Sequence, residues 1–168
     1  MDPIKILGIK QSFSKELIKH IYYLNEENTP EVGSLPSVKT LEELIKMSSN
    51  ALYLSKNDEV IGFIICFRED SVYGSENYKF FNNKNKKFLY IDRVVVKDGY
   101  RRMGHGTKIY KHLDKIASEL LLPICCEVNS IPKNEVSINF HINNGYKEVG
   151  ERDFKNHSVK YFEKKYIK

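Results

Sequence analysis

The sequence predicts an α/β (α+β) fold with one central sheet of about six to seven strands and about four helices. Three observations support this prediction. The length fits a single domain over residues 1–168, and the chain has no internal repeat or linker. With 41% hydrophobic and 29% charged residues, the composition is that of a globular protein. Segments with apolar residues at helical spacing also alternate with short runs of β-branched and aromatic residues.

The N-terminal part predicts a short strand followed by two helices. Isoleucines alternate with other residues from Ile4 to Ile9, which favours a strand. Ser14 then caps a helix whose apolar residues recur at helical spacing: Leu17, Ile18, Ile21, Tyr22 and Leu24. Residues 28–36 contain two prolines and a glycine and predict a loop. Thr40 is expected to open the second helix, with Glu43 at the capping-box position.

The middle of the chain predicts an antiparallel hairpin and then a central strand. The apolar runs 51–54 and 60–67 are separated by the polar turn 56–59. Residues 68–87 are polar with scattered aromatics and predict a long loop of the kind that lines functional sites. Phe88 to Val96 is the most strand-like run, and its three final valines indicate burial on both faces.

The C-terminal part predicts two more helices and three more strands. A glycine-rich turn follows the central strand, and apolar residues at helical spacing continue to Leu120. A strand is expected at 124–128, and then a short helix that ends at Gly145. Two final strands are expected at 146–150 and 158–166, and their exposed edge leaves a monomer and a homodimer both open.

Composition also narrows the setting and the partners. A net charge of +5 permits attraction to anions without choosing among nucleic acid, acidic protein and phosphorylated cofactors. No apolar stretch is long enough to span a bilayer, and the N-terminus does not resemble a secretion signal, so we expect a cytoplasmic protein with no membrane partner. Cys66, Cys125 and Cys126 lack metal-ligand spacing, which predicts reduced, buried cysteines and no metal.

A phosphate-binding loop is predicted where the central strand ends. The segment Arg101-Arg102-Met103-Gly104-His105-Gly106 leads from the strand into a helix. Free backbone N–H groups and the positive end of a helix dipole bind phosphate oxygens at such a turn, and two arginines add charge. The spacing does not fit a Walker loop, and Ile109 stands where a dinucleotide-binding fingerprint needs a third small residue.

The spacing of Arg101, Gly104 and Gly106 matches Arg/Gln-x-x-Gly-x-Gly/Ala and resembles the pyrophosphate loop of the GNAT superfamily of N-acetyltransferases. The expected order of elements resembles this family along most of the chain. The segments 90–96, 126–129 and 140–146 look like a bacterial branch of predicted acetyltransferases. The resemblance implies a mixed, mostly antiparallel sheet and acetyl-CoA as the co-substrate.

The resemblance also implies which residues hold the cofactor. The backbone of Val94, Val95 and Val96 would pair with the pantetheine arm as an added strand. Backbone N–H groups of the loop would surround the pyrophosphate, through the residues Arg101, Arg102, Met103, Gly104, His105, Gly106 and Thr107. Asn134 matches an asparagine that steadies the cofactor arm, although a helix N-cap explains it equally well.

Three residues are candidates for proton transfer. His141 stands where the family has a tyrosine that protonates the leaving thiolate; a histidine can donate a proton at neutral pH, and a hydrogen-bonded core histidine is the alternative. Asp92 and Glu127 are acids inside apolar strands, and either can take the proton of the attacking amine. The structural alternatives are a cross-strand ion pair for Asp92, with Arg93 on the opposite face, and a hydrogen bond to a loop for Glu127. We favour Glu127 as the base.

The resemblance predicts direct transfer of an acetyl group to a primary amine in a ternary complex, with a strand N–H near Val94 or Val95 stabilising the oxyanion. The acceptor is a small-molecule amine or a protein N-terminus, held by residues 24–40 and 68–87. Two alternatives stay open: an acyl-CoA sensor without turnover, and an RNA-associated protein that would use the aromatic and basic residues of 78–87. Nucleic acid is not the expected partner.

Overall fold

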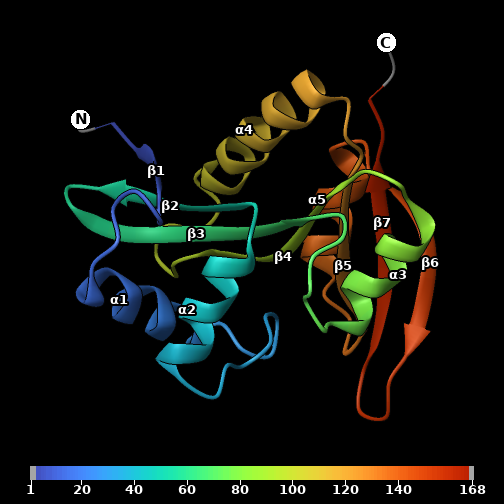
Figure 1. Ribbon diagram of the computed structural model, residues 1–168, viewed down its shortest axis with the longest axis horizontal. Helices are drawn as coiled ribbons and strands as arrows, with labels where there is room; N and C mark the ends of the chain where they lie inside the picture. The colour runs from blue at the N-terminus through green and yellow to red at the C-terminus, as the bar shows by residue number, and fades with distance from the viewer. Residues whose placement is uncertain (1–2, 167–168) are drawn as a thin grey trace.

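The computed structural model describes residues 3–166, which form a seven-stranded sheet in the order β1-β2-β3-β4-β5-β7-β6 (Figure 1). The strands are β1 (Lys5–Gly8), β2 (Asn50–Lys56), β3 (Glu59–Arg68), β4 (Leu89–Val96), β5 (Ile124–Ile131), β6 (Lys147–Asp153) and β7 (Ser158–Lys164). Only β4 and β5 pair in parallel. The prediction of a mixed, mostly antiparallel sheet is therefore confirmed.

Five helices lie in the described part of the chain and cover both faces of this sheet. They are α1 (Lys15–Glu26), α2 (Val38–Met47), α3 (Glu76–Lys84), α4 (His105–Leu120) and α5 (Glu135–Asn143). Side chains of α1, α2 and α3 pack into one apolar cluster with one face of the sheet, and those of α4 and α5 pack into a second cluster on the other face. A site that opens through the sheet can thus receive one ligand from each face.

Two sequence predictions about helices were wrong. Residues 68–87 are not a continuous loop, because α3 forms there; Ser75 caps it by accepting a hydrogen bond from the N–H of Tyr78, and the side chains of Tyr78 and Phe81 are buried. The second helix begins before Thr40, because the Ser37 hydroxyl accepts a hydrogen bond from the Thr40 N–H at 3.2 Å. Ser14 caps α1 as predicted.

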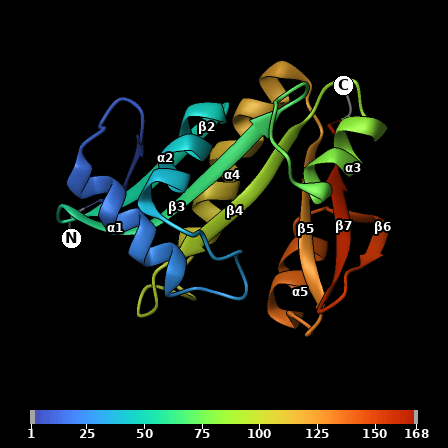
Figure 2. The same cartoon turned by 60° about the horizontal axis from the view of Figure 1, so that its bottom comes forward.

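The two central strands separate after a short paired stretch. Leu89 pairs with Ile124 and Tyr90 with Cys125, and no further pairs join β4 to β5 in the described chain. Figure 2 shows the two strands spreading apart from this point. The strands leave the remaining edge of β4 unpaired, so the sheet opens a V-shaped gap at its centre.

No helix among residues 3–166 is long and apolar enough to cross a membrane. Cys66, Cys125 and Cys126 are buried and unpaired with one another, as predicted.

Candidate active site

The N-terminus of α4 presents unpaired backbone donors. Gly104 is the N-cap residue with φ of +81°, and it contributes no side-chain capping bond. The first helical hydrogen bond runs from the Lys108 N–H to the Gly104 carbonyl, so the N–H groups of His105, Gly106 and Thr107 have no acceptor among the described residues. A Cβ placed on Gly104 or Gly106 would meet no atom within 4 Å, so the space beside these donors is open. This turn can receive an anion such as a pyrophosphate.

The unpaired edge of β4 presents the backbone groups of alternate residues. Lys97 donates its N–H to the Ile61 carbonyl of β3 at 2.8 Å, and Val95 lies opposite Phe63 of the same strand. Because backbone groups alternate in direction along a strand, those of Val94 and Val96 face the gap and those of Val95 face β3. An extended arm lying in the gap would therefore pair with Val94 and Val96.

The side chain of Arg101 does not point toward the helix N-terminus. Its Nε donates to the Val96 carbonyl at 3.1 Å, and its Nη2 donates to the Asn28 side chain in the α1–α2 loop. Arg102 and Met103 are exposed in the turn, where Arg102 has a positive φ of 62°. The groups of this turn that can bind an anion are therefore its backbone N–H groups. The Arg101 side chain connects the turn to the α1–α2 loop on the other face of the sheet.

The Asp92 carboxylate is buried and accepts hydrogen bonds from two neighbours. The β3–β4 pairing skips Asp92, because Ile65 pairs with Arg93 and Cys66 with Ile91. This bulge brings Asp92 and Arg93 together at 2.8 Å, which corrects the expectation of a cross-strand ion pair with Arg93 on the opposite face. The Tyr73 hydroxyl donates to the other carboxylate oxygen at 2.7 Å. Because both carboxylate oxygens accept hydrogen bonds, this geometry favours a structural role for Asp92 over proton transfer.

Glu127 lies in the middle of β5, because this strand continues to Ile131 and does not end at residue 128 as predicted. Its carboxylate accepts a hydrogen bond from the Tyr90 hydroxyl of β4 at 2.7 Å, which replaces the predicted bond to a loop and spans the gap. Burial and then the nearby charge of Asp92 raise the pKa of Glu127 to about 8, against the lowering effect of Tyr90 and Asn77. A carboxylate with such a pKa is suited to accept the proton of an amine near neutral pH.

His141 is buried on the opposite face of the sheet, against α4. Its Nδ1 lies 2.7 Å from the Ser137 carbonyl, which only accepts, so Nδ1 carries a proton. Nε2 then accepts from the Tyr110 hydroxyl at 2.8 Å. Burial lowers the pKa of His141 and keeps the ring neutral. These contacts favour the core-histidine alternative, and a catalytic role for His141 stays a prediction.

We expect His141→Phe to destabilise the protein more than it slows catalysis. The change deprives the buried Tyr110 hydroxyl of its acceptor, which costs roughly 1–3 kcal/mol of unfolding free energy. Chemical denaturation measures this loss, and amine-dependent CoA release should fall less than about tenfold, since the neutral ring does not supply the proton. His20→Phe, at an exposed position of α1, is the matched control. A hundredfold loss of turnover with unchanged stability would instead identify His141 as the acid.

Asn134 is the N-cap residue of α5, in agreement with the helix N-cap alternative. Its side-chain oxygen accepts a hydrogen bond from the Ser137 N–H at 3.2 Å. Its own N–H donates to the Asn129 carbonyl at 3.0 Å, which holds the start of α5 against the end of β5. Contact with a cofactor arm stays a prediction.

Sequence reasoning missed several polar residues around the carboxylates. Tyr90 carries a usable signal, because it stands two residues before Asp92 in the central strand. Tyr73 comes from the segment that was expected to line a site, but nothing in its local sequence indicates Asp92 as its partner. Asn77, on the unpredicted helix α3, accepts a hydrogen bond from the Tyr161 hydroxyl at 2.8 Å.

The same geometry disfavours a covalent acyl-enzyme on a cysteine, and it also disfavours the RNA-associated alternative. Burial raises the pKa values of the Cys125 and Cys126 thiols, which disfavours an acyl-enzyme. The aromatic side chains of Tyr78 and Phe81 lie in the core, and Phe80 stacks on Tyr161, so they present no stacking surface for RNA.

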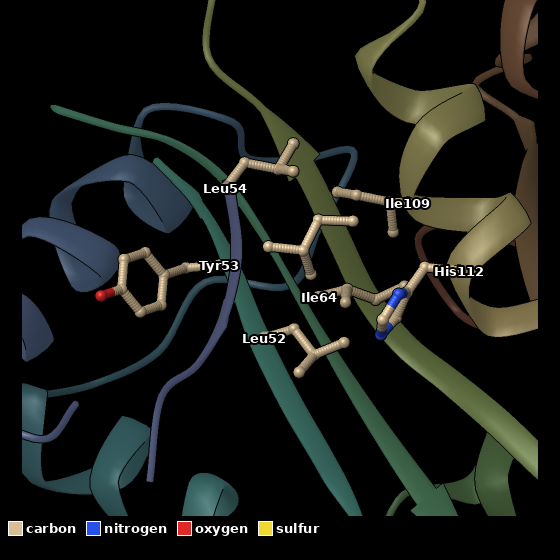
Figure 3. Close-up of a pocket in the computed structure, with 7 residues that line it drawn as sticks. Leu52, Tyr53, Leu54, Ile64, Ile109 and His112 are labelled. Carbon is tan, nitrogen blue, oxygen red and sulfur yellow. The ribbon is translucent and has the colours of Figure 1, made fainter. Parts of the chain in front are cut away.

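The apolar pocket of Figure 3 lies away from both carboxylates, between the β2–β3 hairpin and α4. Leu52, Leu54 and Ile64 point toward Ile109 and His112 there, and the space is too narrow for water. A more open cleft of about 240 Å³ lies between α1 and the β2–β3 turn and includes Glu27, Glu59 and Lys97. Neither pocket contains a predicted cofactor-binding or catalytic residue, although the open cleft includes Leu24 and Glu27 of the predicted acceptor segment 24–40. We therefore propose the gap between β4 and β5 as the site.

Comparison with known proteins agrees with this geometry. The model of the acetyltransferase (GNAT) family matches residues 18–146. The ribosomal-protein-S18-alanine N-acetyltransferase from Escherichia coli is similar in structure, with a TM-score of 0.70 and 15% identity over 97% of this chain and 94% of that chain. Arabidopsis thaliana Naa50, in complex with the bisubstrate analogue CoA-Ac-MVNAL, gives a TM-score of 0.71 and 18% identity over 97% and 99%.

An aminoglycoside 6'-N-acetyltransferase complexed with coenzyme A gives a TM-score of 0.73 and 17% identity, with 98% of each chain covered. At these identities the structural likeness shows the fold alone. No curated protein matches the chain in sequence.

Proposed function

We propose that this chain, which belongs to the acetyltransferase (GNAT) family, transfers an acetyl group from acetyl-CoA to a primary amine by direct attack in a ternary complex. One observation carries the proposal: an open strand edge, an open anion cradle and a carboxylate of raised pKa meet around the gap between β4 and β5. In this proposal residues 1–168 act as one domain, as a monomer or homodimer in the cytoplasm.

The residues on the cofactor side fit acetyl-CoA, which supplies the thioester. The N–H groups of His105, Gly106 and Thr107 would receive the pyrophosphate, and the open spaces at Gly104 and Gly106 allow its close approach. The backbone of Val94 and Val96 would hold the pantetheine arm. CoA-bound structures of the relatives support this assignment.

Glu127 is the proposed general base. It would take a proton from the attacking amine, directly or through one water, and the Tyr90 hydroxyl fixes its carboxylate at the gap. The Val94 N–H would stabilise the oxyanion, because it faces the gap whereas that of Val95 faces β3. Burial, and after it the nearby charge of Asp92, raises the pKa of Glu127 into the range in which a carboxylate can act as a base toward an amine.

The acceptor is a small-molecule amine or a protein N-terminus. The relatives include enzymes whose names specify each of these acceptor classes. Both classes approach from the face that carries α1, α2 and α3, where Glu127, Asp92 and Tyr73 lie. Fold similarity does not separate the two classes.

A screen for CoA release over a panel of small amines and N-terminal peptides tests the proposal. We expect at least one acceptor to stimulate release. We expect Arg101→Glu to weaken acetyl-CoA binding, because it removes the hydrogen bonds from the turn to Val96 and Asn28 and adds a negative charge to the turn before α4. If acetyl-CoA stabilises the fold while no acceptor stimulates release, the enzyme proposal is wrong. The sensor alternative would then stand.

A further inference from the structure

The buried guanidinium of Arg93 contacts both Asp92 of β4 and the α1–α2 loop. Its Nε donates to Asp92 at 2.8 Å within β4. Its Nη1 donates to the Asn25 side chain at 2.9 Å and to the Gly33 carbonyl at 3.1 Å. Only 7% of the Arg93 side chain is exposed. One planar group therefore fixes the distance between the Asp92 bulge and a loop that is remote in sequence.

The α1–α2 loop is held from its other side by the end of α1. Asn25 is fully buried and also donates to the Gly33 carbonyl, at 3.2 Å. The Glu26 carboxylate accepts hydrogen bonds from the Ser34 hydroxyl at 2.5 Å and from the Leu35 N–H at 3.1 Å. The residues 33–35 are thus held in one conformation directly beside Arg93.

The same loop reaches both sides of the gap between the central strands. Asn28 accepts a hydrogen bond from Arg101, which follows β4, and the Pro30 carbonyl accepts one from the Asn129 side chain of β5 at 3.4 Å. In Figure 2 the loop, in blue, lies between the lower ends of β4 and β5. An acceptor that reaches Glu127 from this face must pass the loop.

We propose that Arg93 is a positioning residue for the acceptor amine: it holds the α1–α2 loop at a fixed distance from Asp92 and thereby sets the width of the acceptor entrance. This inference rests on the proposed acetyl transfer. Within residues 3–166, Arg93 makes no hydrogen bond to the anion cradle or to Glu127, so we expect its effect to fall on the acceptor and not on acetyl-CoA.

Stability alone gives a weak reason to bury this ion pair. Desolvation of two charges offsets most of their attraction, and apolar residues of similar volume often stabilise a protein as well. A planar guanidinium with three fixed acceptors instead specifies geometry, which the single ammonium of lysine does not reproduce. The arrangement is therefore suited to precise spacing.

Arg93→Lys tests this inference. It keeps the positive charge beside Asp92 and removes the guanidinium group that donates hydrogen bonds to Asn25 and to the Gly33 carbonyl of the loop. We expect the KM for the best acceptor of the screen to rise about tenfold, with the Kd of acetyl-CoA changed less than about twofold. Hydrogen exchange of residues 28–36 should become faster. Asn25→Ala, which leaves the Arg93–Asp92 pair intact, should act in the same direction. Arg152→Lys, at an exposed position of β6, is the matched control.

The outcomes separate this inference from the proposed function. A wild-type protein that acetylates no acceptor overturns both. An active wild type with an unchanged acceptor KM in Arg93→Lys overturns the positioning role alone, as does an equal weakening of acceptor and acetyl-CoA binding, which indicates general loss of structure. If circular dichroism shows that Arg93→Lys is unfolded, Asn25→Ala replaces it. An unchanged acceptor KM in Asn25→Ala, or an equal weakening of acceptor and acetyl-CoA binding, then overturns the positioning role.

Discussion

Replacing Glu127 with glutamine is expected to reduce kcat/KM for the acceptor by about 10² to 10⁴, the range that a general base contributes. The amide preserves the shape of the side chain and a hydrogen bond with Tyr90 but cannot accept a proton from the amine. Acetyl-CoA binding should change less than about twofold, because the cradle lies at the start of α4. Stopped assays of CoA release, together with calorimetric titration of acetyl-CoA, measure the two effects separately.

The pH dependence gives the same prediction a second measurement. Since the unprotonated form of Glu127 is the base, kcat/KM should rise with pH and level off above about 8. Asp92→Asn should move this inflection to lower pH, because it removes the like charge that raises the pKa. An acceptor whose own pKa lies below about 7 keeps its titration out of the profile.

Glu119→Gln, at an exposed position of α4, is the control and should leave both rate and profile unchanged. A Glu127→Gln protein that retains more than a third of the wild-type kcat/KM would exclude Glu127 as the base. The kcat/KM measurement should then be repeated with Asp92→Asn, which removes the other carboxylate of the site.

Gly104→Val should weaken acetyl-CoA binding about a hundredfold, equivalent to roughly 2.7 kcal/mol. Gly104 has φ of +81°, a left-handed conformation in which a β-branched residue is strained. The valine side chain would also fill the open space beside the unpaired N–H groups that we assign to the pyrophosphate. Calorimetry of acetyl-CoA binding, or the rise in Tm that acetyl-CoA causes, measures the loss.

Gly74→Val is the matched control for this prediction. A Cβ at Gly74 meets no atom within 4 Å, and its backbone is not left-handed, so acetyl-CoA should bind as it does to the wild type. Binding within threefold of wild type in Gly104→Val would mean that the turn before α4 does not hold the cofactor.

Most of the fold could be predicted because its signals are local. Alternation and β-branched runs located the strands, and helical spacing located α1, α4 and α5. Helix α3 escaped prediction because its pattern is short, with Tyr78 and Phe81 as its only buried residues, and its packing against β4 stabilises it more than its own sequence does. The start of α2 was misplaced because Ser37 and Thr40 are both good N-cap residues.

The turn that we propose as the anion cradle was determined by the sequence itself, since its donors are consecutive backbone groups and Gly104 provides the left-handed backbone there. The surroundings of the carboxylates were decided only by the tertiary structure. A bulge turned Asp92 toward Arg93, the divergence of β4 and β5 placed Tyr90 beside Glu127, and Asn25 met Arg93 across a separation of 68 residues. The pKa of Glu127 and the proposed acceptor entrance depend on these long-range distances, which no local pattern of residues specifies.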